Sequence, residues 1–169
     1  MAFDDQLGVR DPIPLISIAN TYVQQGEFFA AARNMLRAVA FAPDDPTAYG
    51  QLGVVYYKSR NYEGSILPLR CAVRGCSAAE SCLVRNGGLE CAAESIPDIP
   101  IHGLELTNNS VVYYYHLGSV LAGLHQPNNH YCDEAMTVFD EIRAKFANDE
   151  TIMGIVREGE TICVFYGSH

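Results

Sequence analysis

Four of the six cysteines fall in one stretch of the chain, at positions 71, 76, 82 and 91. Clustered thiolates are common ligands of structural zinc, but closed tetrahedral sites favour closely paired ligands, and this cluster is spread out. A free cysteine on a helix behaves as a small apolar side chain. We therefore expect Cys71, Cys76, Cys82 and Cys91 to be reduced, buried thiols, with a zinc site as the alternative.

A second group of potential ligands, His125, His130 and Cys132, lies in a polar stretch that contains a proline. It lacks an obvious fourth ligand, so we interpret these side chains as loop residues. The sequence contains no Gly-x-Ser-x-Gly elbow, no phosphate-binding glycine loop and no His-Glu-x-x-His pair. We predict no catalytic residue, no cofactor and no metal, and a protein that is not an enzyme.

The charge of the 169-residue chain is acidic and unevenly distributed. Residues 1–75 carry seven basic and seven acidic side chains, so the whole net charge of −9 lies in residues 76–169. Binding to nucleic-acid phosphates needs clustered lysine and arginine, and the chain has only two lysines, so a nucleic-acid partner is excluded. An acidic second half is either a solvated surface or a surface that favours a basic partner.

The expected location of the protein rests on what the sequence lacks. No apolar stretch approaches the ~20 residues that a membrane span requires, and the first residues do not resemble a signal peptide. We expect a soluble, intracellular protein of the cytoplasm or nucleus with no membrane partner, in which cysteines stay reduced.

Residues 11–42 match residues 45–76 when the sequence is shifted by 34 positions. Both copies start with an Asp-Pro pair and keep an aromatic residue in the first half and an Ala-Val pair in the second. The matching positions are Asp11 and Asp45, Pro12 and Pro46, Tyr22 and Tyr56, Ala38 and Ala72, and Val39 and Val73. A fixed period of this length is typical of a repeat architecture.

Each copy predicts two helices. Asp11 and Asp45 suit the N-cap position, and the prolines that follow suit the first helical turn. Gly26 is placed to end the first helix in a left-handed conformation. The second helix of the first copy is expected over about 28–41, where its inner face would bury Ala31, Met35 and Ala38.

A third, displaced copy lies near the C-terminal end. Its first helix contains Tyr114, Leu117, Gly118 and Leu121, and its second contains Ala135, Phe139 and Ile142. The connection between them, 124–132, is longer than in the first two copies and polar. Asp149 is placed to cap one further helix over about 150–166, which would cover the last repeat.

Residues 76–109 interrupt the repeats between the second and third copies. Glycines and prolines in this stretch rule out a long helix pair. We expect one short helix over 77–85 and an extended segment over 99–106. The alternative is a degenerate repeat.

The small residue Ala19, the aromatic Tyr22, Gly26, Phe28 and the alanines and proline that follow resemble a tetratricopeptide (TPR) repeat. The resemblance covers three repeats, about 11–44, 45–77 and 110–147, plus the capping helix. It implies an all-α fold, a TPR-like α-solenoid of antiparallel helix pairs with about seven helices and an irregular insertion. We expect one domain, 1–169, with a flexible N-terminus over 1–10.

In proteins that this chain resembles, the first helices of the repeats line a concave groove that binds a peptide or helix of a partner. The resemblance therefore implies a protein-binding adaptor or assembly subunit. The positions that correspond to the groove are Ile16, Asn20, Val23, Gln24, Gly50, Val54, Tyr57, Lys58, Tyr115, Ser119 and Ala122. For Val54 and Tyr57, a place in the core is the alternative to a place in the groove.

Some TPR proteins bind the C-terminal carboxylate of heat-shock chaperones with a clamp of cationic and amide side chains. Of the five clamp positions, the sequence keeps only Asn20. The others are Ile16, Gln51, Val112 and His116. None of these carries a permanent positive charge, and a buried carboxylate without cationic donors is costly, so this partner is disfavoured.

Two alternative functions come from other features. The apolar run 162–166 predicts self-association as a homodimer or as a structural subunit of a complex. The cysteine cluster leaves a metal-binding or redox module as a third hypothesis.

Overall fold

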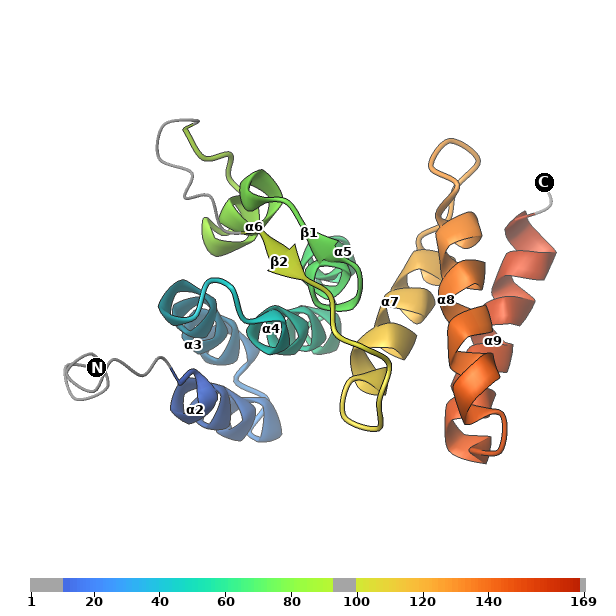
Figure 1. Cartoon of the computed structure of the whole chain (residues 1–169), viewed down its shortest axis with the longest axis horizontal. Coiled ribbons are helices and arrows are strands. Elements are labelled where there is room, and N and C mark those ends of the chain that lie inside the picture. The colour runs from blue at the N-terminus through green and yellow to red at the C-terminus, as the bar shows by residue number, and fades with distance from the viewer. Residues whose placement is uncertain (1–10, 93–99, 168–169) are drawn as a thin grey trace. The chain divides into compact units, whose positions relative to one another are not determined.

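The computed structural model describes residues 11–92 and 100–167, which form eight helices and one two-stranded sheet (Figure 1). The expected all-α class with antiparallel helix pairs is confirmed for this part of the chain. The flexible N-terminus expected over 1–10 lies outside the described residues. The chain divides into two compact units, residues 1–104 and 105–169, and each is described by itself. A single domain over 1–169 stays a prediction.

The first helix pair of unit 1 consists of α2 (Ile13–Gln24) and α3 (Phe28–Phe41), with α3 beginning and ending where the sequence predicts. The carboxylate of Asp11 accepts a hydrogen bond from the Ile13 amide at 3.0 Å, but the N-cap residue of α2 is Pro12, one position after the expected Asp11. Gly26 follows α2 with a φ of 76°, in the left-handed region. The predicted inner face of α3 is wholly buried at Ala31, Met35 and Ala38.

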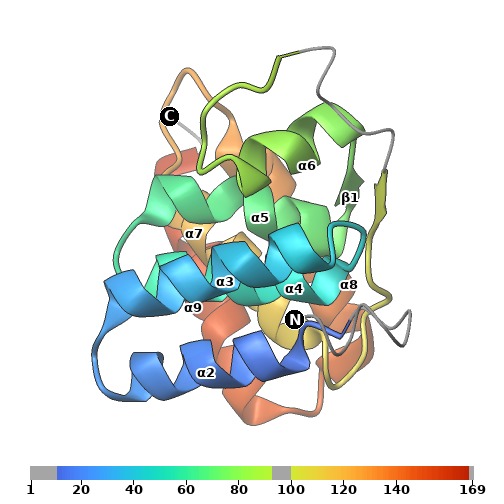
Figure 2. The same ribbon diagram turned by 90° about the vertical axis from the view of Figure 1, so that its left-hand side faces the viewer.

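The second pair, α4 (Pro46–Lys58) and α5 (Tyr62–Val73), repeats this arrangement. The Asp45 carboxylate accepts a hydrogen bond from the Thr47 amide at 2.9 Å. Helices α4 and α5 approach closely, because a Cβ atom on Gly53 would lie 2.6 Å from Cγ of Leu69. The helices α2 to α5 pack in succession, each against the next (Figure 2).

The residues between the second and third copies belong to unit 1 up to residue 104 and to unit 2 from residue 105. They contain β1 (Gly75–Cys76), α6 (Ala78–Arg85) and β2 (Ile101–His102). The two strands pair in antiparallel fashion, with Gly75 opposite His102 and Cys76 opposite Ile101. The extended segment is thus confirmed at 101–102, and residue 99 lies outside the described part of the chain.

A capping box defines the start of α6. The Ser77 side chain accepts a hydrogen bond from the Glu80 amide at 3.1 Å, and the Glu80 carboxylate accepts one from the Ser77 amide at 3.0 Å. Ser77 stands where the first repeat has its closing proline, and it begins a new helix there. The short helix predicted over 77–85 is confirmed.

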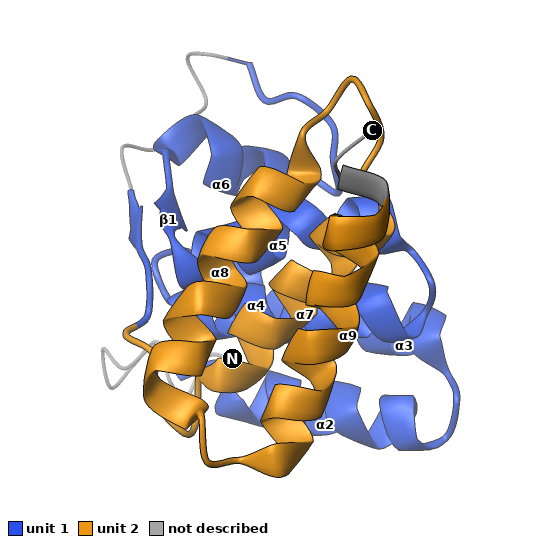
Figure 3. Ribbon diagram, turned by 90° about the vertical axis from the view of Figure 1, so that its right-hand side faces the viewer, with its two compact units in different colours: residues 1–104 blue, residues 105–169 orange. Residues whose placement is uncertain are grey.

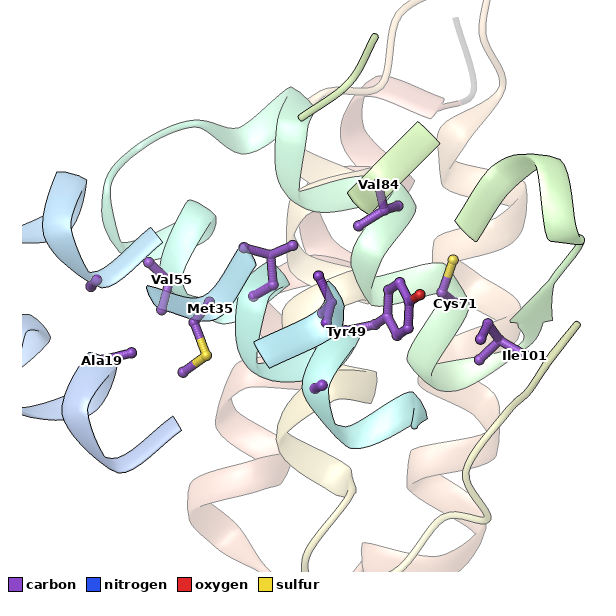
Figure 4. Close-up of a cluster of buried hydrophobic side chains, with 11 residues drawn as sticks. Ala19, Met35, Tyr49, Val55, Cys71, Val84 and Ile101 are labelled. Atoms are coloured by element: carbon purple, nitrogen blue, oxygen red, sulfur yellow. The ribbon is translucent and has the colours of Figure 1, made fainter. Parts of the chain in front are cut away.

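The core of unit 1 draws residues from every element of the unit except β1 and the loops. Figure 4 shows the side chains of Tyr49, Cys71, Val84 and Ile101 gathered in one buried cluster. Val84 comes from α6 and Ile101 from β2, so both folded pieces of the insertion cover the second helix pair. The core therefore depends on a segment that follows no repeat pattern.

Unit 2 is a three-helix arrangement of α7 (Val111–Gly123), α8 (Tyr131–Phe146) and α9 (Glu150–Gly167), with each helix in contact with the other two (Figure 3). The Asp149 carboxylate accepts a hydrogen bond from the Ile152 amide at 3.1 Å, as the predicted cap requires. The helix predicted over 150–166 is present within this unit.

The enlarged connection between α7 and α8 is ordered by one side chain. The amide oxygen of Asn129 accepts hydrogen bonds from the amides of Gln126 (2.9 Å) and Tyr131 (3.2 Å), and its nitrogen donates to the Leu124 carbonyl at 3.1 Å. The polar loop between the two helices is therefore held in a defined conformation by these hydrogen bonds.

The expectation of reduced thiols is wrong. All six cysteines form disulfides, Cys71–Cys76, Cys82–Cys91 and Cys132–Cys163. Their Cα atoms lie 4.8, 6.3 and 5.5 Å apart, distances that a disulfide spans without backbone movement. Sequence reasoning treated the cysteines as apolar helix residues, whereas the fold brings three pairs together.

Candidate partner-binding surface

The groove positions of α2 fall into two pairs. Asn20 and Gln24 are exposed, while Ile16 and Val23 are half-buried and pack against the core cluster of unit 1. This helix therefore offers amide groups to solvent beside partly covered apolar side chains.

The groove positions of α4 differ in how much side chain they expose. Lys58 is exposed, Val54 and Tyr57 are half-buried, and Gly50 is buried. The ring of Tyr57 meets that of Tyr62, on α5, edge to face, with centroids 5.3 Å apart and planes at 68°. Helices α2 and α4, which carry the candidate residues of the first two repeats, contact each other in unit 1.

The third set of candidates lies in unit 2, on α7. Tyr115 and Ser119 are half-buried, and Ala122 is buried. The ring of Tyr115 stacks on that of His116 with centroids 4.9 Å apart, and burial raises the pKa of Tyr115. These residues form a candidate surface of unit 2, separate from the one in unit 1.

None of the positions of the chaperone clamp carries a permanent positive charge. The Nδ1–H of His116 donates a hydrogen bond to the carbonyl of Val112 at 2.7 Å. Asn20 is the one retained clamp residue, and it is exposed. Ile16 and Gln51 are half-buried and supply no cation.

Neither candidate metal site has its expected ligands. Cys71, Cys76, Cys82 and Cys91 are bonded in pairs as disulfides, so they present no thiolate. In the loop, the Nδ1 atom of His125 accepts a hydrogen bond from the Cys132 amide at 3.0 Å, and Cys132 is itself bonded to Cys163. Within residues 11–92 and 100–167, no group of three or more His, Cys, Asp or Glu side chains could hold a metal ion.

A cavity of about 240 Å³ in unit 1 was not predicted. Its walls come from α4, α5 and α6, and they include Tyr56, Leu67, Pro68, Leu83 and Val84. Burial at this place raises the pKa of Tyr56. The cavity exists because α6 packs against α5, and the sequence predicted this helix but not its packing.

The C-terminal part of α9 exposes large apolar side chains. Val164 and Phe165 are 69% and 63% exposed, and they line a shallow depression with Arg157, Glu160 and Thr161. Glu160 forms an ion pair with Arg143, on α8. The side chain of Tyr166, part of the predicted apolar run, lies outside the described residues.

Within residues 11–92 and 100–167, no helix is both long enough and apolar enough to cross a bilayer.

Comparison with known families identifies the repeat. Residues 19–59 match a family model described as TPR repeat, and they span the second half of α2, all of α3 and all of α4. A TPR repeat region is therefore present in unit 1, and such repeats act as protein–protein interaction modules. No curated protein and no solved structure matches the chain.

Proposed function

We propose that the protein binds a peptide or amphipathic helix of a partner protein on the first helices of its repeats, without catalysis. The observation that carries the proposal is the TPR repeat region over residues 19–59, because repeats of this kind usually bind other proteins. The proposed surface, called here the first-helix surface, comprises Ile16, Asn20, Val23, Gln24, Gly50, Val54, Tyr57 and Lys58 in unit 1. The separate candidate surface of unit 2 comprises Tyr115, Ser119 and Ala122.

The side chains of this surface define the chemistry of the partner. Val23, Val54 and Tyr57 are half-buried, so each keeps some apolar surface that a partner side chain can cover. The exposed Lys58 adds a positive charge at the end of α4. A segment with apolar anchors at helical spacing and an acidic residue beside them complements this arrangement. Gly50 and Ala122 are buried, so they affect the shape of the surface rather than its area of contact with a partner.

Tyr57 is the most informative residue to change. Tyrosines are enriched among residues that dominate binding energy, and loss of one such contact costs about 1–3 kcal/mol. We expect Tyr57→Ala to reduce the recovery of the partner in affinity purification from the native cell, with the co-purified proteins identified by mass spectrometry. Titration with the identified segment then measures the loss of affinity.

Two control variants separate binding from structure. Tyr62→Ala removes the same ring contact with Tyr57 but leaves Tyr57 in place, and Phe29→Ala removes an aromatic ring that is 83% exposed on α3. Both controls are expected to retain the partner. Equal recovery with Tyr57→Ala and the two controls would remove Tyr57 from the binding surface.

Self-association is the second candidate function, and the exposure of Val164 and Phe165 favours it. Apolar side chains of this size in one patch are typical of contact surfaces. If α9 is a dimer contact, light scattering of the intact chain gives a mass that rises with concentration. The variant Val164→Ser/Phe165→Ser is then monomeric, whereas Leu89→Ser, at a similarly exposed site of unit 1, is not. A wild-type monomer at all concentrations excludes this candidate.

A further inference from the structure

Asn108 is the one asparagine of the sequence that is followed two positions later by serine or threonine, in the triplet Asn108-Asn109-Ser110. This triplet is the acceptor sequence for N-linked glycosylation. Because such triplets also arise by chance, the sequence alone does not assign a modification. Structure and cysteine chemistry add two independent observations.

The first observation is the position of Asn108 in the fold. It is exposed in the turn that precedes α7, within unit 2. The hydroxyl of Thr107 accepts hydrogen bonds from the amides of Asn109 and Ser110, both at 3.2 Å, and the Thr107 amide donates to the Ser110 hydroxyl at 2.8 Å. The turn is thus held by Thr107 and Ser110, so a group on the side-chain nitrogen of Asn108 leaves its hydrogen bonds intact.

The surface beside Asn108 also has room for sugar residues. An open depression of about 560 Å³ adjoins it, lined by Lys145, Phe146, Asn148, Asp149 and Glu150 as well as Asn108 itself. Charged and amide side chains are suitable hydrogen-bond partners for sugar hydroxyls. The first sugars of a glycan can lie against this surface without displacing any part of unit 2.

The second observation is the state of the cysteines. All six form disulfides, and disulfides form and persist in oxidising environments such as the lumen of the endoplasmic reticulum and the cell exterior. The endoplasmic reticulum is also where N-linked glycans are added. The pairing of all six cysteines and the exposed acceptor triplet therefore indicate the same compartment, which differs from the cytoplasm or nucleus expected from the sequence.

We propose that Asn108 carries an N-linked glycan, added in the secretory pathway. The donor is an oligosaccharide attached to a lipid through a diphosphate. The amide nitrogen of Asn108 attacks the anomeric carbon of the first sugar and forms the N–C bond. The anomeric C–O bond breaks, its electron pair leaves with the lipid diphosphate, and the nitrogen loses one proton to a base of the transferase.

Ser110 sets the order of events. In the fold this serine is only 4% exposed, and its hydroxyl donates a hydrogen bond to the carbonyl of Glu105. A transferase that must read the serine hydroxyl cannot reach it in the folded turn. The glycan is therefore added to the chain before unit 2 folds, and the folded protein is not a substrate.

The decisive experiment uses the protein purified from the cells that make it. Intact mass is measured before and after treatment with peptide N-glycosidase, followed by sequencing of the peptide 107–113. The expected result is a loss of mass equal to an oligosaccharide and conversion of Asn108 to aspartate. Recovery of the peptide from untreated protein with Asn108 wholly unmodified overturns the proposal.

Variants of the full chain, expressed in the same cells, test the acceptor triplet. Asn108→Gln is expected to abolish the shift in mass. Asn109→Gln keeps an Asn-x-Ser triplet and is expected to retain it, as is Ser110→Thr. A glycan that persists in Asn108→Gln, or that disappears in Asn109→Gln, contradicts the assignment to Asn108.

Discussion

Arg85 of α6 donates a hydrogen bond to the hydroxyl of Tyr49 on α4, across 2.9 Å. The same hydroxyl donates to the carbonyl of Pro43 at 2.7 Å, and Arg85 also donates to the hydroxyl of Ser81 at 3.1 Å. Tyr49 is fully buried, so its hydroxyl depends on these partners. One polar group thereby links the end of the first repeat, the second repeat and the insertion.

The network predicts a loss of stability in Tyr49→Phe. The substitution leaves the Pro43 carbonyl and one donor of Arg85 without their partner, and an unsatisfied buried polar group costs about 1–3 kcal/mol. Urea denaturation is expected to show this decrease in the free energy of unfolding. Tyr56→Phe is the matched control, because the hydroxyl of Tyr56 is not part of the network, and it is expected to change stability less.

A double-mutant cycle tests the link between the two residues. Tyr49→Phe and Arg85→Met are expected to be non-additive, with a coupling of about 0.5–3 kcal/mol, because the residues share a hydrogen bond. Strict additivity would show that the insertion is not coupled to α4 through this contact.

Stability is expected to fall in alkaline solution. Burial raises the pKa of Tyr49 above its ordinary value near 10, and this effect outweighs the neighbouring Arg85, which lowers it. Burial also raises the pKa of Tyr56. The folded state then holds the two phenolic protons more tightly than the unfolded state. The stabilisation that results is complete below about pH 10 and is lost as the pH rises through the folded-state pKa of each tyrosine.

Urea denaturation between about pH 8 and pH 11 measures this dependence. The wild type is expected to lose stability over the upper part of that range, and the double variant Tyr49→Phe/Tyr56→Phe is expected to lose less. Parallel curves for the two proteins would assign the loss to other groups.

Two glycines of unit 2 lie against the ring of Phe139, which is fully buried. A Cβ atom on Gly118, in α7, would lie 2.4 Å from Cε1 of Phe139, and one on Gly159, in α9, would lie 2.3 Å from Cζ. Overpacking of a core typically costs about 1–3 kcal/mol. We expect Gly118→Ala and Gly159→Ala to lower the midpoint of thermal unfolding, although alanine favours a helix.

Gly154 provides the control for this prediction. It lies in the same helix as Gly159, and a Cβ atom there would meet nothing within 4 Å. Gly154→Ala is expected to stabilise α9 by up to about 1 kcal/mol, through helix propensity alone. Equal effects at positions 154 and 159 would contradict the close packing against Phe139.

The helix pairs were predictable because their signals are local. The carboxylates of Asp11 and Asp45 bind amides at the starts of two helices, and Gly26 follows the end of one, all within a few residues of the backbone concerned. In contrast, β1 and β2 are two residues each and are far apart in the sequence. Neither strand therefore carries a local signal that predicts its pairing with the other. The sequence therefore predicted the short helix α6 but not the cavity that it forms with α4 and α5.

The candidate surface was predictable only as a set of positions. The repeat register places Gly50 and Ala122 beside residues that a partner could contact, yet both are buried. Helical spacing gives the direction of a side chain but not what the neighbouring elements cover. The disulfides show the same limit, since six cysteines allow fifteen pairings and only the fold selects one.

The disulfides are expected to stabilise the two units to different extents. Cys132–Cys163 joins residues 31 positions apart, from the start of α8 to the end of α9, whereas Cys71–Cys76 joins residues 5 apart. In the chain-entropy account a cross-link stabilises more when it closes a longer loop, by about 3–4 kcal/mol for the first pair and about 2 kcal/mol for the second.

Alkylation of the native protein is expected to modify no cysteine without a reductant and all six after reduction and unfolding. Hydrogen exchange measured by mass spectrometry then compares the variants Cys132→Ala/Cys163→Ala and Cys71→Ala/Cys76→Ala. The first is expected to lose more protection, in α8 and α9, and the second to lose less, in α5. Free thiols in the protein from its native cell would contradict the pairing, and equal losses would contradict the dependence on loop length.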